Sequence, residues 1–122
     1  MTNTENKPKI HLYMDDWRPC PDGFALARTG EECLTLLQEC EVGILSLDHE
    51  MGPGEPSGSE VAARIVANGT FPQEIYLHTS SEYGRRSMYE ILYAGKPDHV
   101  VLHRGPMPDE VRKRTADEQS SP

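Results

Sequence analysis

The stretch VGILSLDHE, residues 42–50, passes directly from an apolar run into Asp48, His49 and Glu50. Residues 42–47 are apolar at nearly every position, which is typical of a strand in a parallel sheet with both faces covered. The pattern predicts a buried strand that ends at a carboxylate and an imidazole. Asp48 then has three open roles: a phosphoacceptor, a metal ligand, or the polar end of a buried strand.

Strand-like and helix-like segments alternate on both sides of this stretch. We predict strands over residues 9–14, 24–28, 42–47, 74–80 and 99–105, and helices over residues 29–41, 57–69, 80–95 and 108–119. This alternation predicts an α/β fold with a parallel five-stranded sheet, right-handed crossovers and helices on both faces, which is a three-layer arrangement.

Two of the predicted helices begin with a capping-box pattern. Thr29 and Glu32 are three residues apart, and so are Ser57 and Glu60. In such a box each side chain accepts a hydrogen bond from a free N–H group at the start of the helix. Gly69 is expected to end the second helix.

The first two predicted strands are joined by WRPCPDG, residues 17–23, which contains two prolines and an Asp-Gly pair. These residues predict a loop, although parallel strands normally need a crossover of a dozen or more residues. We therefore expect a loop in place of the first crossover helix. The sheet face near strands 1 and 2 would then be uncovered, which would suit a homodimer or a protein partner.

The chain has 122 residues and a formal net charge of −8. This length suits one domain, which we place at residues 9–112, between a disordered lead (1–8) and a charged, frayed tail (113–122). The acidic balance argues against a protein that coats nucleic acid by bulk charge. No apolar run has the length of a membrane span. Three cysteines without a CxxC pair predict free thiols and a cytoplasmic location.

In parallel α/β sheets the ligand site lies beyond the carboxyl ends of the strands. Four of the predicted strands end in polar or ionisable side chains, namely Asp15, Asp16, Asp48, His49, His78, Thr79, Ser80, His103 and Arg104. The three aspartates are hard oxygen donors of the kind that Mg²⁺ or Mn²⁺ prefers. The sequence therefore predicts a metal site at this edge of the sheet, although adjacent acids such as Asp15 and Asp16 can also cap a turn.

The runs YMDD (13–16), SLD (46–48) and LHTS (77–80) resemble the receiver, or response-regulator, domain. The wider set of DDWRP, LSLDHE, LHTS and the GR and M that follow is more specifically similar to cyclic-phosphate-processing receiver-like domains. The resemblance covers about residues 9–112 and implies a receiver, or flavodoxin-like, fold. It also implies phosphoester chemistry on RNA ends or cyclic nucleotide phosphates.

The resemblance to receivers implies a role for several strand-end residues. Asp15 and Asp16 would be metal ligands, Asp48 would occupy the phosphoacceptor position, and the Thr79 hydroxyl would contact the phosphoryl group. A receiver also has a lysine after its fifth strand, but here that position falls on or beside His103. This departure weakens the analogy with a phosphorelay protein.

The leading hypothesis is a metal-assisted phosphoesterase that acts on a cyclic or terminal nucleotide or RNA phosphate. Such hydrolysis needs an activated water, neutralisation of phosphate charge, and a proton for the leaving oxygen. His49 and His78, with ordinary pKa values of about 6.5, would divide the base and acid work beside Asp48. The phosphate would be bound by Arg18, Thr79, Ser80, Arg85, Arg86 and His103.

Arg85 and Arg86 fall early in the helix after LHTS, where the helix dipole disfavours cations. This placement is understandable if they face a bound anion. Plainer interpretations stay open: the two arginines could be surface charge, His49 an ordinary loop residue, and His78 a hydrogen-bonded core histidine. Trp17 could stack on a nucleobase or pack where the first helix is missing.

Two other functions stay open. The chain could be a signalling receiver that is phosphorylated on Asp48, in which case the histidines have no role. It could also be a degenerate receiver that only binds another protein through the uncovered sheet face.

Overall fold

The computed structural model describes residues 7–120 and contains one parallel sheet of five strands, in the order β2-β1-β3-β4-β5. The strands are β1 (Lys9–Met14), β2 (Ala25–Ala27), β3 (Glu41–Leu47), β4 (Glu74–Leu77) and β5 (Val101–Leu102). Every neighbouring pair is parallel. The predicted α/β fold with a parallel five-stranded sheet is confirmed.

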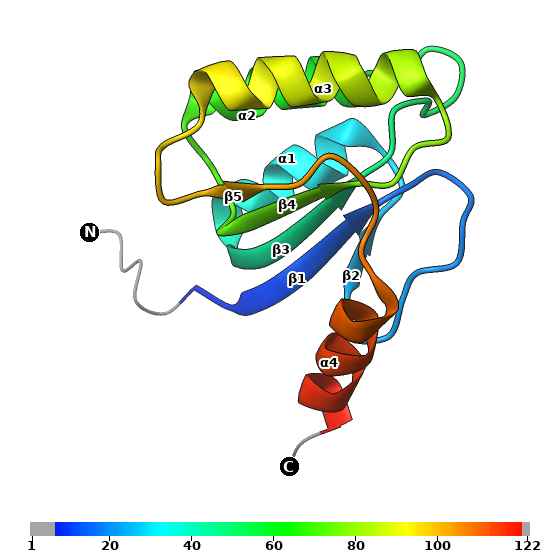
Figure 1. Ribbon diagram of the computed structural model, residues 1–122, viewed down its shortest axis with the longest axis vertical. Coiled ribbons are helices and arrows are strands. Elements are labelled where there is room, and N and C mark those ends of the chain that lie inside the picture. Colours follow the sequence, from blue (N-terminus) through cyan, green and yellow to red (C-terminus); the bar gives the residue numbers. More distant parts are fainter. Residues whose placement is uncertain (1–6, 121–122) are drawn as a thin grey trace.

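Four helices complete three layers. α1 (Gly30–Glu39), α2 (Gly58–Asn68) and α3 (Glu82–Gly95) lie on one face of the sheet, and α4 (Asp109–Ser120) lies on the other (Figure 1). The apolar residues of the strands that face α1–α3 form the core together with these helices. No helix in the described part of the chain is long and apolar enough to cross a membrane.

β3 alternates between the two faces of the sheet, and both faces are covered. Leu45 and Leu47 belong to the core under α1–α3. Because successive side chains of a strand point to opposite faces, Ile44 and Ser46 face the α4 side, where they are 3% and 0% exposed. β3 is therefore covered on both faces, as its apolar run predicted.

The caps of α1 and α2 differ from each other. Ser57 and Glu60 form the complete capping box, and Gly69 ends α2 with φ 72°. At α1 the Thr29 hydroxyl accepts from the Glu32 N–H, but the Glu32 carboxylate accepts from the Arg28 N–H at 2.7 Å. The predicted box at Thr29 is thus only half formed, because the carboxylate reaches the N–H one residue earlier.

The connection from β1 to β2 is a loop, as predicted. A turn in which the Phe24 N–H donates to the Pro21 carbonyl leads into β2. Within this turn Gly23 has φ 88°, and its Cα lies against the backbone carbonyl of Thr115 in α4. Thr115 is 1% exposed, so α4 packs directly on the loop that replaces the missing helix.

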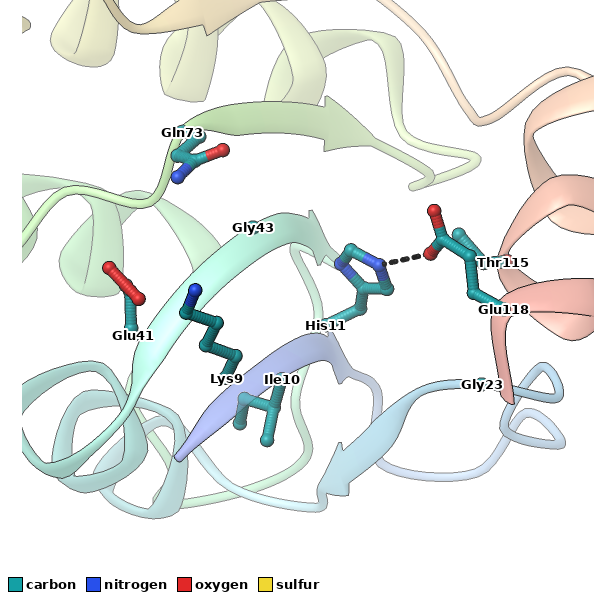
Figure 2. Close-up of a pocket in the computed structure, with 9 residues that line it drawn as sticks. All are labelled: Lys9, Ile10, His11, Gly23, Glu41, Gly43, Gln73, Thr115 and Glu118. Carbon is teal, nitrogen blue, oxygen red and sulfur yellow. Dashed lines mark hydrogen bonds and ion pairs between the residues drawn. The ribbon is translucent and has the colours of Figure 1, made fainter. Parts of the chain in front are cut away.

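The sheet face on the side of α4 is therefore covered in part. A cavity of about 550 Å³ lies at the amino ends of β1 and β3, lined by His11, Thr115 and Glu118 among others (Figure 2). His11 Nε2 lies 3.0 Å from Glu118 Oε1, and His11 Nδ1 accepts from the Ile44 N–H. The ring of His11 thus links β3 to α4, and the cavity lies at the sheet edge opposite to the predicted site.

β4 and β5 are shorter in the structure than predicted. β4 ends at Leu77 because residues 79–81 form a turn, in which the Ser81 N–H donates to Thr79 Oγ1. β5 begins only at Val101, after a turn that pairs the Val100 N–H with the Pro97 carbonyl. The domain end expected at residue 112 falls inside α4, and residues 1–6 of the expected lead lie outside the described residues.

Candidate functional site

Side chains from the carboxyl ends of β1, β3 and β4 meet at one edge of the sheet. Ligand atoms of Asp15, Asp48 and His78 all lie within 4.8 Å of one another. Asp15 is fully buried and Asp48 is 4% exposed. The tertiary structure therefore brings together three of the residues that the sequence pattern placed at strand ends.

Asp15 accepts four hydrogen bonds. Oδ1 accepts from the backbone N–H groups of Trp17 and Arg18, both at 2.9 Å. Oδ2 accepts from Arg18 Nη1 at 2.8 Å and from His78 Nε2 at 2.9 Å. Burial raises the pKa of Asp15, but these hydrogen bonds outweigh it and lower the pKa to about 2. Asp15 thus both caps a turn and belongs to the cluster.

Arg18 lies between the two buried carboxylates. Its Nη1 is 2.8 Å from Asp15 Oδ2 and 3.4 Å from Asp48 Oδ2. The guanidinium also lies over the indole of the exposed Trp17, 5.2 Å from the ring centroid. Arg28 donates to the backbone carbonyls of Asp15 and Arg18, at 3.3 and 3.0 Å, and so fixes the loop. Arg28 was not predicted as a site residue. Nothing in the sequence of the second strand indicates that the side chain of Arg28 contacts the loop after β1.

Asp48 is the least engaged carboxylate of the pair. Its Oδ1 accepts from the His49 N–H at 2.8 Å, whereas Oδ2 has only the 3.4 Å contact with Arg18. Burial raises the pKa of Asp48, and the carboxylates of Asp15 and Asp16 act in the same direction. Oδ1 of Asp16 is itself buried without a hydrogen-bond partner among residues 7–120. The site therefore has negative charge that one guanidinium does not fully balance.

His78 is held on both ring nitrogens. Nε2 donates to Asp15, Nδ1 lies 2.7 Å from Ser46 Oγ, and the ring stacks on Tyr13 with centroids 4.3 Å apart. Since a carboxylate only accepts, the Asp15 contact places the proton on Nε2 and makes Nδ1 the acceptor for Ser46. Burial lowers the pKa of His78 to about 4. Ser46 was missed as a site residue, although a lone hydroxyl in an apolar run is a usable signal.

His49 keeps one ring nitrogen free. Nε2 lies 3.1 Å from Ser59 Oγ, which in turn donates to Ser87 Oγ at 2.7 Å. Nδ1 is buried and has no hydrogen-bond partner within the described residues. The ring packs against Gly84 in the first turn of α3, where a Cβ would clash with it. Ser59 and Ser87, both missed by the sequence reasoning, thus orient the histidine that follows Asp48.

Comparison with known proteins identifies the family. Residues 10–94 match the family described as the cyclic-phosphate processing receiver domain. The chain belongs to that family.

A solved structure agrees with this receiver fold. The receiver domain of the Francisella response regulator 1452 is similar with a TM-score of 0.56 at 18% sequence identity, over 93% of this chain and 98% of that chain. At this identity the likeness concerns the fold alone. No curated protein sequence matches the chain.

The hydrogen bonds of other predicted site residues of this receiver domain go to groups other than Asp15 and Asp48. Thr79 is buried, and its Oγ1 accepts from the Ser81 N–H, while Ser80 is exposed. His103, which stands where the resemblance places a lysine, lies 2.7 Å from Glu74 and stacks on Tyr76. Their roles in phosphate binding stay predictions.

Arg85 and Arg86 line a different cavity of this receiver domain, together with Arg104. No hydrogen bond or ion pair joins either residue to Asp15 or Asp48 in residues 7–120. Successive residues of a helix project about 100° apart. Gly84 lies on the side of α3 that packs against His49, so Arg85 and Arg86 project from other sides of this helix.

The donor set of this site fits a hard divalent cation. The cluster of possible ligand atoms consists of Asp15, Asp48 and His78 and does not include the predicted ligand Asp16. Within residues 7–120, Asp16 Oδ1 is a buried oxygen without a hydrogen-bond partner, and Asp48 Oδ2 has one long contact. Carboxylate oxygens are the ligands that Mg²⁺ and Mn²⁺ prefer. Asp15 is less available, because both of its oxygens already accept hydrogen bonds.

Proposed function

We propose that this receiver domain is a metal-assisted phosphoesterase that processes a cyclic or terminal nucleotide phosphate. The observation that supports it most is a pair of buried polar atoms without hydrogen-bond partners in residues 7–120: Asp16 Oδ1, after the end of β1, and His49 Nδ1, after the end of β3. Buried polar groups are normally hydrogen-bonded, so these two atoms, each next to a strand end, are positions that a bound ligand would satisfy. The description of the family as cyclic-phosphate processing supports the same conclusion.

Asp15, Asp16 and Asp48 would hold Mg²⁺ or Mn²⁺. The ion would supply positive charge to the phosphate oxygens and lower the pKa of a bound water. Arg18 would contribute in the same way: its guanidinium already lies beside both buried carboxylates, and a guanidinium binds phosphate oxygens through two N–H groups.

His49 is the better candidate for proton transfer. Hydrolysis forms a bond from a water oxygen to phosphorus and breaks the ester P–O bond; the water loses a proton and the leaving oxygen gains one. Nδ1 of His49 has no hydrogen-bond partner within the described residues, since Ser59 engages Nε2. It would accept the proton of the water once the contact with Gly84, which covers this side of the ring, opens. His78 has both nitrogens engaged and a pKa lowered to about 4 by burial, so its contacts suit it to positioning Asp15.

The test is turnover of nucleoside 2′,3′-cyclic phosphates and of RNA with a 2′,3′-cyclic end, followed by chromatography with Mg²⁺, Mn²⁺ or EDTA. We expect metal-dependent ring opening. His49→Ala should lower kcat by about a hundredfold or more, and Asp48→Asn should abolish turnover. Arg64→Ala is the control, because Arg64 pairs with Glu31 on the surface. Unaltered kcat in His49→Ala would contradict the assignment.

A signalling receiver is the second candidate, and one observation favours it: Asp48 Oδ2 is the least engaged oxygen of the two buried aspartates. A phosphoryl group could be accepted there. Incubation with acetyl phosphate or beryllofluoride and Mg²⁺, followed by mass spectrometry and fluorescence, would detect a stable adduct on Asp48. Such an adduct without turnover of cyclic phosphates would replace the esterase proposal.

A further inference from the structure

A cavity of about 350 Å³ lies between α3 and Arg104. Its lining includes three arginines, Arg85, Arg86 and Arg104, together with the ring of Tyr89. Glu82 and Glu90 complete it. Three guanidinium groups and two carboxylates leave one positive charge in this cavity, in a chain whose formal net charge is −8.

The arginines of this cavity are not held in ion pairs within the described residues. Within residues 7–120, Arg85, Arg86 and Arg104 form no ion pair, whereas Arg18 and Arg64 do. The guanidinium of Arg104 lies 4.1 Å from the centroid of the Tyr89 ring. Stacking of this kind fixes the plane of the guanidinium and leaves its in-plane N–H groups free for an acceptor.

The cavity lies at the same edge of the sheet as the proposed active site. Arg104 follows the end of β5, and Asp48 follows the end of β3, two strands away in the sheet order. Two strand spacings amount to about 10 Å. Arg85 is also next to Gly84, which packs on the His49 ring. One extended ligand can therefore reach both places.

We propose that this arginine cavity is a second phosphate subsite, which binds a phosphodiester next to the terminal phosphate of a single-stranded oligonucleotide. The inference rests on the proposed function and narrows its substrate to oligonucleotide ends, because a mononucleoside cyclic phosphate has no second phosphate. A guanidinium group can bind two oxygens of a phosphate through two parallel N–H donors. Two exposed aromatic rings near the active site, Trp17 at 69% and Tyr83 at 76% exposure, offer surfaces on which bases stack.

The kinetic test compares a trinucleotide with a 2′,3′-cyclic end against the corresponding mononucleoside cyclic phosphate. In Arg85→Ala/Arg104→Ala, the ratio of kcat/KM for the trinucleotide to that for the mononucleotide should fall about tenfold or more. Arg86→Ala, at an exposed position, is a milder variant in case the double variant does not fold. Arg64→Ala removes one positive charge from α2 and should leave the ratio unchanged. An unchanged ratio in folded Arg85→Ala/Arg104→Ala would overturn the subsite.

A binding test separates this inference from the proposed activity. Fluorescence anisotropy in EDTA, with a labelled trinucleotide ending in a 3′-phosphate, needs no turnover. Weaker binding by about tenfold in the double variant supports the subsite even if no substrate is hydrolysed. Turnover of cyclic phosphates with equal trinucleotide binding by wild type and double variant overturns the subsite but leaves the activity standing. Competition by polyglutamate as strong as by the oligonucleotide overturns it in favour of an acidic protein partner.

Discussion

At the scale of single residues, Arg18 is central to the site because its guanidinium lies between the buried carboxylates of Asp15 and Asp48. Removing the guanidinium leaves Asp15 and Asp48 without their cation, and an unpaired buried charge is costly. The exposed Arg64 forms its ion pair with Glu31 in water, where such pairs contribute little. The two arginines therefore give a matched pair for measurement.

We expect Arg18→Ala to lower the free energy of unfolding by about 3 kcal/mol, measured by urea denaturation in EDTA. Mg²⁺ should restore part of this loss, because the ion then meets less competition for Asp48 and stabilises the folded state by binding it. Arg64→Ala should change stability by less than about 1 kcal/mol and should not alter the response to Mg²⁺. No stabilisation of either Arg18→Ala or wild type by Mg²⁺ would argue against a cation at these carboxylates.

His78 makes stability depend on pH. Its pKa is lowered from 6.5 in the unfolded chain to about 4 in the folded protein, because it is buried. Below pH 6.5 the unfolded state takes up a proton that the folded state refuses, so stability falls as the pH falls and the loss is complete below about 4. This loss is about 3 kcal/mol. Urea denaturation in EDTA between these limits should show it, and His78→Asn should have a flatter profile there.

Asp15 adds a second decline at lower pH. Its folded pKa of about 2 is below the ordinary 3.8, so the stability that it contributes is present above 3.8 and is lost as the pH falls toward 2. In His78→Asn the loss of stability between pH 3.8 and 2 should persist, whereas the loss between pH 6.5 and 4 should disappear. Identical pH profiles for wild type and His78→Asn above pH 4 would contradict the buried neutral imidazole.

At the scale of elements, α4 takes the place left by the missing first crossover helix, and Gly23 permits this contact. A Cβ at Gly23 would clash with the Thr115 carbonyl, and the residue also has φ 88°. Gly54 has a similar φ of 78°, but nothing lies near its Cα on the side where a Cβ would project. The two glycines thus separate the cost of the backbone conformation from the cost of the helix contact.

Gly54→Ala should lower the free energy of unfolding by about 1 kcal/mol, the usual cost of a left-handed conformation for a residue with a Cβ. Gly23→Ala should lower it by about 3 kcal/mol, since backbone atoms of α4 must also move. Thermal unfolding of the two variants measures the difference. Equal losses would show that α4 does not pack firmly on the loop.

At the scale of the whole molecule, association through the sheet face near β1 and β2 stays a prediction. α4 already covers part of this face through Thr115 and through the contact of His11 with Glu118. A chain that ends at Pro108 should expose Tyr13 and Ile44, now 7% and 3% exposed, and should self-associate. Light scattering of both chains measures this. A monomeric truncated chain would indicate that the face has no tendency to associate.

Local patterns in the sequence determined the order of strands and helices, the loop after β1 and the strand ends at which polar residues gather. Apolar runs, caps such as Ser57 with Glu60, and breakers such as Pro19 and Gly69 act on their own neighbours, so they can be read without the fold. The lengths of β4 and β5 were overestimated because turns at 79–81 and 97–100 compete with the ladder.

The roles of the strand-end residues depend on contacts that form in the folded protein. His78 and His49 have the same side chain, yet contacts with Asp15 and Ser46 engage both nitrogens of the first. Packing against Gly84 buries Nδ1 of the second, which has no hydrogen-bond partner in the described part of the chain. Arg28 and Ser46 entered the site, while Arg85 and Arg86 joined Arg104 in another cavity. Sequence spacing places a residue on a strand or a helix turn, but its hydrogen-bond partners and burial come from segments far along the chain, and these set its pKa and its charge.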